Sequence, residues 1–323
     1  MKRLPLLAGL ALLVALLFVA SLAAGKIFVP FIAWFSDDPR WWIVAELRLP
    51  RAILGLVIGA GLGLTGAVLQ GYLRNPLADP SVLGVSSSAA LGAVAAIVLF
   101  AASAPLAIFG AAMLAAGGSM LLLAALAWRS QSAVTFVLAG TVLASLGGAL
   151  TAFLISIAPN PYATAEIIDW IMGSLTDRSF AEVQLAVPFI LAGGVLLLFT
   201  GRALDALTLG EDAARSLGLR LERTQALVVV GAGLVVGASV AVTGVVGFVG
   251  LIVPHLLRPL VGARPSALLL PSALGGAALV LAADSLVRLA PGASEIRLGV
   301  AMALIGTPFF FGLLLKLRRS AWI

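Results

Sequence analysis

The sequence predicts an all-α polytopic membrane protein with about ten transmembrane helices. Of its 323 residues, 62% are hydrophobic and only 11% are charged, and the mean hydropathy is +1.16. The apolar residues gather in uncharged runs of about the length of helix that crosses a bilayer. A water-soluble domain, which carries roughly 25% charged residues, is therefore excluded.

Ten apolar runs, each near the length that a bilayer demands, are the expected transmembrane helices. In chain order they are 4–25, 52–73, 81–101, 105–128, 133–157, 184–200, 225–243, 244–262, 266–283 and 298–316. The second run contains Gly55, Gly59 and Gly63 at every fourth position. This spacing places the three glycines on one helix face, where a neighbouring helix can approach closely.

The stretch 225–257 fits either one span or two. It holds no Asp, Glu, Lys or Arg over 33 residues, which is too long for one untilted helix, and Gly244, Gly247 and Gly250 offer a break. Cytoplasmic loops carry an excess of Lys and Arg, which decides between the two. With ten spans, 13 of the 20 basic residues lie on the side of the N-terminus and 7 on the other side. With a single span here the inside count falls to 10, so ten spans with both termini in the cytoplasm is the better interpretation.

The chain shows no internal repeat and no linker, so we expect one transmembrane permease-like domain over residues 1–323. Residues 1–25 also fit a signal peptide, and its removal would leave nine spans with the new N-terminus outside. The hydrophilic intervals are the surfaces available to partners. They are a cytoplasmic segment at 201–223 and outer segments at 26–51, 158–183 and 284–297.

The groups that membrane-embedded chemistry needs are missing from the sequence. None of the three lysines, Lys2, Lys26 and Lys316, follows a glycine-rich phosphate loop, so any ATP dependence must come from a second polypeptide. Cysteine is absent, His255 is the only histidine, and no serine-nucleophile or His-Glu-x-x-His motif occurs, so we expect no catalytic residue and no metal site. Ionisable residues lie almost wholly near span ends, whereas secondary transporters usually keep some at the membrane midplane.

The cytoplasmic interval contains a predicted short amphipathic helix. Leu209, Ala214 and Leu217 recur at roughly helical spacing, Glu211 lies where a helix N-terminus favours negative charge, and Gly218 can end the helix. Such a helix fits a solvated connector or a membrane-surface helix. It also fits a docking helix on a protein that lacks its own motor.

Several long motifs in a fixed order resemble the permease family of ABC importers for iron-siderophores, haem and vitamin B12. The resemblance covers the chain from about residue 40 to its C-terminus. Its motifs are LRLPR (47–51), Gln70, RNPLADPSVLG (74–84), LAGTVLASL (138–146), LGEDAARSLGL (209–219), GFVGLIVPHLLR (247–258), LLLPSALGGA (268–277), AADSLVR (282–288) and GTPFFFGLLLK (306–316).

The resemblance implies a type II ABC importer permease in the bacterial inner membrane, non-catalytic and without a cofactor of its own. Its expected partners are a second copy of itself, two ATP-binding cassette ATPase subunits that hold ATP and Mg, a periplasmic substrate-binding protein and membrane lipid, but no nucleic acid. The expected cargo is a metal chelate, an iron-siderophore or haem first and cobalamin next. The alternative is a secondary transporter or channel that works without ATPases; a membrane enzyme would need a catalytic cluster that the sequence lacks.

The resemblance also assigns residues to surfaces. Arginine can hold a carboxylate bidentately, although arginines beside a span often only anchor it at the headgroups. By this resemblance the binding protein would dock at Arg48, Arg51 and Arg288. The ATPase would contact Leu209, Gly210, Glu211, Ala214, Leu217 and Gly218. The translocation pathway would be lined by Thr141, Ser145, Thr151, Met172 and Gly173.

One departure from the family pattern lies directly before the last span. The family commonly has Glu-Leu-Pro-hydrophobic-Gly, whereas this chain has Arg297 in place of the proline. The arginine restores a backbone donor and adds an outer charge, so it is expected either as a fourth docking contact or as a like-charge neighbour of Arg288.

His255, in a motif that the family carries across different substrates, is expected to be structural rather than a haem ligand.

Overall fold

A computed structural model describes residues 3–127, 133–262, 264–291 and 295–320. Within these residues ten apolar helices of 13 to 25 residues correspond to the ten predicted spans. They are α1 (Arg3–Ala23), α2 (Leu49–Tyr72), α3 (Val85–Phe100), α4 (Pro105–Ala127), α5 (Ala133–Ser156), α7 (Phe180–Leu198), α10 (Leu221–Thr243), α11 (Val249–Val261), α12 (Pro265–Leu289) and α13 (Leu298–Ser320). Seven helices are long and apolar enough to cross a membrane, and α3, α11 and α13 supply shorter apolar stretches.

Short helices connect the long ones. Near the N-terminus these are η1 (Phe31–Ala33) and the π-helical η2 (Ile43–Arg48), and η3 (Pro80–Leu83) precedes α3. The remaining three are α6 (Pro161–Ile171), α8 (Gly201–Leu207) and α9 (Glu211–Ser216).

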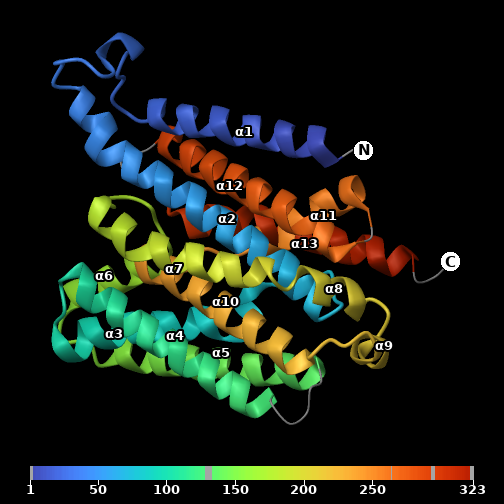
Figure 1. Cartoon of the computed structure of the whole chain (residues 1–323). Helices are drawn as coiled ribbons and strands as arrows, with labels where there is room; N and C mark the ends of the chain where they lie inside the picture. The colour runs from blue at the N-terminus through green and yellow to red at the C-terminus, as the bar shows by residue number, and fades with distance from the viewer. Residues whose placement is uncertain (1–2, 128–132, 263, 292–294, 321–323) are drawn as a thin grey trace.

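The long helices run side by side, and the connections gather at two opposite ends of the bundle (Figure 1). We call the end that carries residues 24–48, α6 and residues 295–297 the arginine end, and the end that carries α8 and α9 the α9 end. Both ends of the described chain lie at the α9 end. An even number of crossings requires this placement, which agrees with ten spans.

The uncharged stretch 225–257 is divided as predicted. α10 ends at Thr243, Gly244 follows with φ +68°, and α11 begins at Val249. A Cβ at Gly244 would collide with the carbonyl oxygen of Trp170. Glycine therefore supplies both the left-handed backbone and the space for α6 at this break.

The helix α2 lies at the centre of the bundle, between α12 on one side and α7 on the other (Figure 1). Its predicted glycine face is confirmed: a Cβ at Gly59 would meet the carbonyl oxygen of Gly276, and one at Gly63 that of Ser272, both on α12. The two backbones pack directly because no side chain separates them. Gly55 has only ordinary contacts with Leu175 and Leu281, at 3.5 Å.

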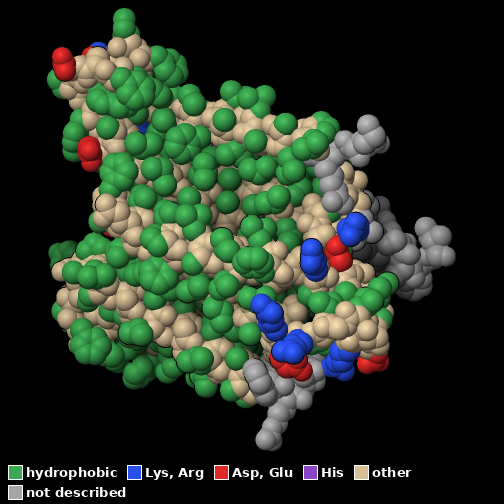
Figure 2. Space-filling model, viewed as in Figure 1, with side chains coloured by type: hydrophobic (Ala, Val, Ile, Leu, Met, Phe, Trp, Pro, Cys, Tyr) green, Lys and Arg blue, Asp and Glu red, His purple; other side chains and the backbone are tan. Residues whose placement is uncertain are grey.

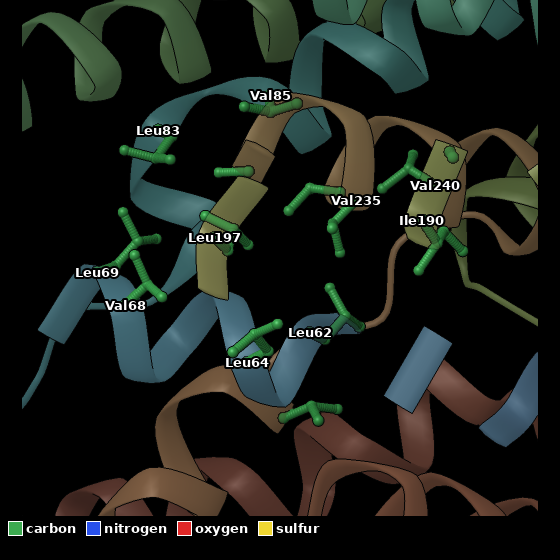
Figure 3. Packing of buried hydrophobic residues seen from close by; sticks show 14 of the residues in the cluster. Leu62, Leu64, Val68, Leu69, Leu83, Val85, Ile190, Leu197, Val235 and Val240 are labelled. Atoms are coloured by element: carbon green, nitrogen blue, oxygen red, sulfur yellow. The ribbon is translucent and has the colours of Figure 1, made fainter. Parts of the chain in front are cut away.

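The largest buried cluster surrounds the second half of α2 (Figure 3). Leu62, Leu64, Val68 and Leu69 of α2 are packed among side chains from α3, α7 and α10 and from the loop before α3. The outer surface of the bundle is also largely hydrophobic, and the charged side chains visible in Figure 2 lie toward its two ends. A bundle that is apolar inside and outside is the expected form of a protein surrounded by lipid.

Candidate functional site

Four buried or half-buried charges form a network at the arginine end. Arg51 holds Asp284 through Nε and Nη2, at 3.0 and 2.8 Å, and its Nη2 lies 2.9 Å from Glu295 Oε2. The Nη2 of Arg288 lies 3.0 Å from the other oxygen of Asp284. Asp284 is 1% exposed, so each of its oxygens is matched by a guanidinium where water is excluded.

Two arginines of this end also cap α1. Arg48 Nη1 donates to the carbonyl oxygens of Leu22 and Ala23, both at 2.9 Å. Arg288 donates to the carbonyl oxygen of Ala24 at 3.1 Å and to Ser21 Oγ at 2.6 Å. The last carbonyls of a helix have no intrahelical partner and carry partial negative charge, so these guanidinium groups fasten α1 to α2 and α12.

Three of the four arginines expected to dock the binding protein are buried within the chain. Arg48, Arg51 and Arg288 are only 6%, 8% and 4% exposed, because internal carboxylates and helix carbonyls already surround their guanidinium groups. Arg297 differs, with a side chain 31% exposed that lies 2.8 Å from Asp169 of α6. The arginine that replaces the family's proline thus ties α6 to the start of α13.

Glu295 connects the network to the loop between α6 and α7. Its Oε2 accepts a hydrogen bond from Thr176 Oγ1 at 3.0 Å, and close by the amide of Gly299 donates to the carbonyl oxygen of Gly173 at 3.1 Å. Burial by itself would raise the pKa of Glu295, but Arg51 and the Thr176 hydroxyl outweigh it and hold that pKa below its ordinary value. Glu295 is therefore the half-exposed carboxylate at the rim of an otherwise buried set.

The predicted amphipathic helix is present as α9 at the opposite end. Gly210 before it and Gly218 after it have φ values of +100° and +82°, and the amide of Leu219 closes its end on the carbonyl oxygen of Ala214. Leu209 and Leu217 are strongly exposed. Ala214, expected as a contact residue, is instead fully buried, because it lies on the face that packs onto the bundle.

Glu211 joins α9 to the loop after α2. Its carboxylate lies 3.7 Å from Arg74 and 3.9 Å from Arg215. These partly exposed pairs contribute little stability, roughly 0–1 kcal/mol each. They orient α9 relative to the end of α2 while Leu209, Gly210, Leu217 and Gly218 stay at least partly accessible.

The structure does not bring the five predicted pathway residues to one surface. Thr141 and Ser145 lie on the exposed face of α5, whereas Thr151 is buried and donates to the carbonyl oxygen of Gly147 at 2.8 Å. Met172 and Gly173 follow α6, and Gly173 is buried with φ +75°. Only the α5 pair shares an accessible face.

The sequence interpretation missed the carboxylates that hold the arginines. Asp284 is one helical turn before Arg288, which was an available signal, but its main partner Arg51 lies 233 residues away.

Gln70, noted only as part of a motif, links α2 to α11: it donates to the carbonyl oxygen of Gly250 at 3.2 Å and accepts from Arg258 at 2.6 Å. The ring of His255, on α11, contacts that of Phe309 on α13 with centroids 5.8 Å apart.

Comparisons with known proteins agree with this architecture. A cobalamin import system permease protein of Halobacterium salinarum is 41% identical over 84% of this chain and 73% of its own length. A molybdate import system permease protein of Haemophilus influenzae is 35% identical over 98% of this chain and 96% of its own length. A solved structure of a metal-chelate type ABC transporter in an inward-facing conformation matches with a TM-score of 0.87 and 33% identity, covering 96% of this chain and 98% of that one.

The family assignment rests on nearly the whole chain. Residues 12–316 match the model of the FecCD transport family, which spans every long helix except the first part of α1 and the end of α13. This chain belongs to the FecCD transport family and is a multi-pass permease subunit of the kind found in metal-chelate and vitamin B12 ABC importers.

Proposed function

We propose that this chain is the membrane permease of an ATP-driven importer that moves a metal chelate inward across the bacterial inner membrane. The observation that carries the proposal is the family match over residues 12–316. The chain performs no covalent chemistry in this account. Transport follows from switching between inward-open and outward-open states, and ATP and Mg are held by a separate ATPase chain.

The ATPase subunits dock at α9. The supporting observation is that α9 stands at one end of the bundle with Leu209 and Leu217 exposed, while Glu211 and Arg74 tie it to α2. The exposed leucines offer an apolar contact for a partner, and the Glu211–Arg74 pair connects α9 to the end of α2. A movement of α9 caused by the partner would therefore be transmitted to the central helix α2. The α9 end, and with it both chain termini, faces the cytoplasm in this proposal.

The substrate-binding protein docks at the arginine end, which faces the periplasm. Because Arg48, Arg51 and Arg288 are internally paired, the accessible charges next to this network are Arg297 and the rim carboxylate Glu295. An acidic side chain of the partner then competes with Asp169 for Arg297 or with Glu295 for Arg51. Rim charges of this kind mainly speed and orient docking.

A second copy of the chain completes the pathway. The supporting observation is the continuous apolar exposed face of α5, which includes Leu138, Val142 and Leu146 together with Thr141 and Ser145. A single polar pair within an apolar face suits a wall past which a bulky chelate moves without tight binding. Iron-siderophores, haem and cobalamin are the candidate cargoes.

The cargo is selected mainly by the binding protein. Relatives of comparable similarity are named for cobalamin and for molybdate, so overall similarity does not choose a cargo. Binding assays of the partner binding protein with cobalamin, haem, a ferric siderophore and molybdate identify the cargo directly. We expect one chelate to bind at least tenfold more tightly than molybdate, and the reverse order would contradict the chelate assignment.

Uptake into liposomes separates this proposal from a secondary transporter or channel. The permease, its ATPase and its binding protein are reconstituted with the cargo that the binding protein selects. We expect uptake only with ATP and all three components. Uptake by the permease alone, driven by a proton or sodium gradient, would establish the alternative.

A further inference from the structure

A cavity of about 180 Å³ lies at the arginine end, behind α6 and away from the exposed face of α5. Its walls come from the ends of α3, α4, α7 and α10, and Trp170 of α6 borders it. Its polar groups are Ser103, Arg178 and Glu182. Neither the family resemblance nor the docking and pathway surfaces described above use this cavity.

Arg178 lacks a partner in the part of the chain that the structure describes. Its Nε is buried and finds no hydrogen-bond acceptor, and no carboxylate lies within ion-pair distance of it. Burial lowers the pKa of Arg178, partly offset by the charges of Glu182 and Asp177, while Arg297 lowers it further. The Nε of Arg178 is thus a buried donor without an acceptor, which is unfavourable, and an anion in the cavity would supply the acceptor.

Glu182 does not form an ion pair with Arg178, because its carboxylate is hydrogen-bonded to Ser179. It is 8% exposed, and its Oε2 accepts hydrogen bonds from the Ser179 amide at 2.8 Å and the Ser179 hydroxyl at 2.7 Å. These bonds form the capping box at the start of α7. The carboxylate therefore lines the cavity as a fixed acceptor, and Arg178 stays beside it as an unused donor.

We propose that the cavity binds a small oxyanion that keeps a hydroxyl group, such as hydrogenphosphate or bicarbonate. The planar fork of Arg178 donates to the anion oxygens, and the anion's hydroxyl donates to the Glu182 carboxylate. A fully deprotonated oxyanion such as sulfate offers no such donor and meets the negative charge of Glu182 directly. The paired donor and acceptor thus set both the charge and the protonation of the ligand.

Binding of the anion in this cavity is expected to stabilise the position of α6. Trp170 borders the cavity, its neighbour Asp169 pairs with Arg297, and its own carbonyl oxygen abuts Gly244 at the α10–α11 break. An anion in the cavity would contact the end of α6 at Trp170. The oxyanion is therefore a structural ligand of the arginine end rather than transported cargo.

The test measures thermal unfolding of the purified chain in phosphate-free detergent micelles, with sodium phosphate, bicarbonate, sulfate or chloride at equal ionic strength. We expect phosphate and bicarbonate to raise Tm saturably by a few degrees, as ligand binding to the folded state requires, and sulfate to act like chloride. Equal effects of all four anions, or no effect, would overturn the proposal and leave a hydrated cavity.

Variants assign the response to the cavity. Arg178→Gln is expected to abolish the phosphate shift, and Arg178→Lys, which keeps the charge without the fork, to weaken it. Glu182→Gln preserves the capping box and is expected to admit sulfate. Arg40→Gln, which alters an exposed arginine of the same end paired with Asp38, is the matched control and keeps the full response.

The phosphate group of a phospholipid would offer the same oxyanion chemistry as free phosphate. A further measurement in lipid distinguishes the two ligands. The same chain is measured in phosphatidylcholine nanodiscs without free phosphate. A free-anion site gives the phosphate shift in nanodiscs as well as in micelles. Stabilisation by phospholipid that free phosphate in micelles fails to reproduce would overturn the assignment, as would an Arg178→Gln variant that folds and responds like the wild type.

Discussion

Asp284 is the residue on which the arginine end most depends. It is the shared acceptor of Arg51 and Arg288, and all three side chains are buried. The three charges stabilise one another only as a set, since removal of one member leaves the others uncompensated in a region without water. Buried ion pairs of this kind fix the relative positions of helices more than they add stability.

Asp284→Asn tests this dependence. We expect a loss of about 3–5 kcal/mol of unfolding free energy, the usual effect of breaking a buried pair, measured by thermal or denaturant unfolding in micelles. Asp38→Asn, which breaks an exposed pair with Arg40, is the control and is expected to leave the unfolding free energy nearly unchanged. Equal small effects of the two changes would mean that the network is hydrated rather than buried.

Glu295 gives the network a dependence on pH. Its pKa in the folded protein lies below its ordinary value, so its contribution is fully present above the ordinary value and is lost as pH falls through the folded pKa. We expect the difference in Tm between wild type and Glu295→Gln to be largest near neutral pH and to shrink below about pH 4.5, the ordinary glutamate value. A difference independent of pH would contradict the pairing with Arg51.

The glycine face of α2 is the element-scale feature that sequence spacing predicted well. Gly59→Ala or Gly63→Ala forces α12 away, because each new Cβ meets a backbone carbonyl. We expect about 1–3 kcal/mol of destabilisation. Gly117→Ala on α4, where nothing lies within 4 Å of the added Cβ, is the matched control and is expected to be neutral or slightly stabilising. Destabilisation by Gly117→Ala of the same size would assign the effect to glycine itself rather than to packing.

The helix α9 was predicted from sequence in its bounds but not in all its contacts. Helical spacing and Gly218 located it, and the exposed Leu209 and Leu217 agree with that pattern. Spacing alone does not tell which of several alanines faces inward, and Ala214, expected to contact the ATPase, is buried against the bundle. The same limit applies to the arginines: local sequence shows that a charge is near a span end, but not that Arg51 is paired with a carboxylate 233 residues away.

In this account, docking of the ATPase depends on Leu209 and Leu217, the exposed leucines that flank α9. Leu209→Glu with Leu217→Glu is expected to lower ATPase co-purification and transport at least tenfold, because apolar contact area is replaced by charge, while Tm stays unchanged since both side chains are exposed. Leu209→Met is the conservative control and retains docking. Full co-purification with the double variant would place the ATPase contact elsewhere.

At the scale of the whole molecule, the ten helices and the shared end of both termini were predictable from apolar length and from the distribution of basic residues. The residues that line the pathway stay a prediction, because the wall that we propose requires a second copy of the chain. The absence of cysteine from the sequence makes a direct test simple. Single cysteines at Thr141 and Ser145 are expected to react with a water-soluble maleimide in the assembled transporter, and one at buried Thr151 is not. Protection of the α5 pair in every state would exclude that face from the pathway.

The central claim is that this permease works only with an ATPase and an outer binding protein. ATP hydrolysis by the purified permease–ATPase complex in lipid nanodiscs, with and without the cargo-loaded binding protein, tests it most directly. The account predicts that the ATPase co-purifies and that the binding protein stimulates hydrolysis severalfold, with stimulation reduced by Arg297→Glu. A permease that recruits no ATPase, yet carries cargo down an ion gradient, would contradict the account.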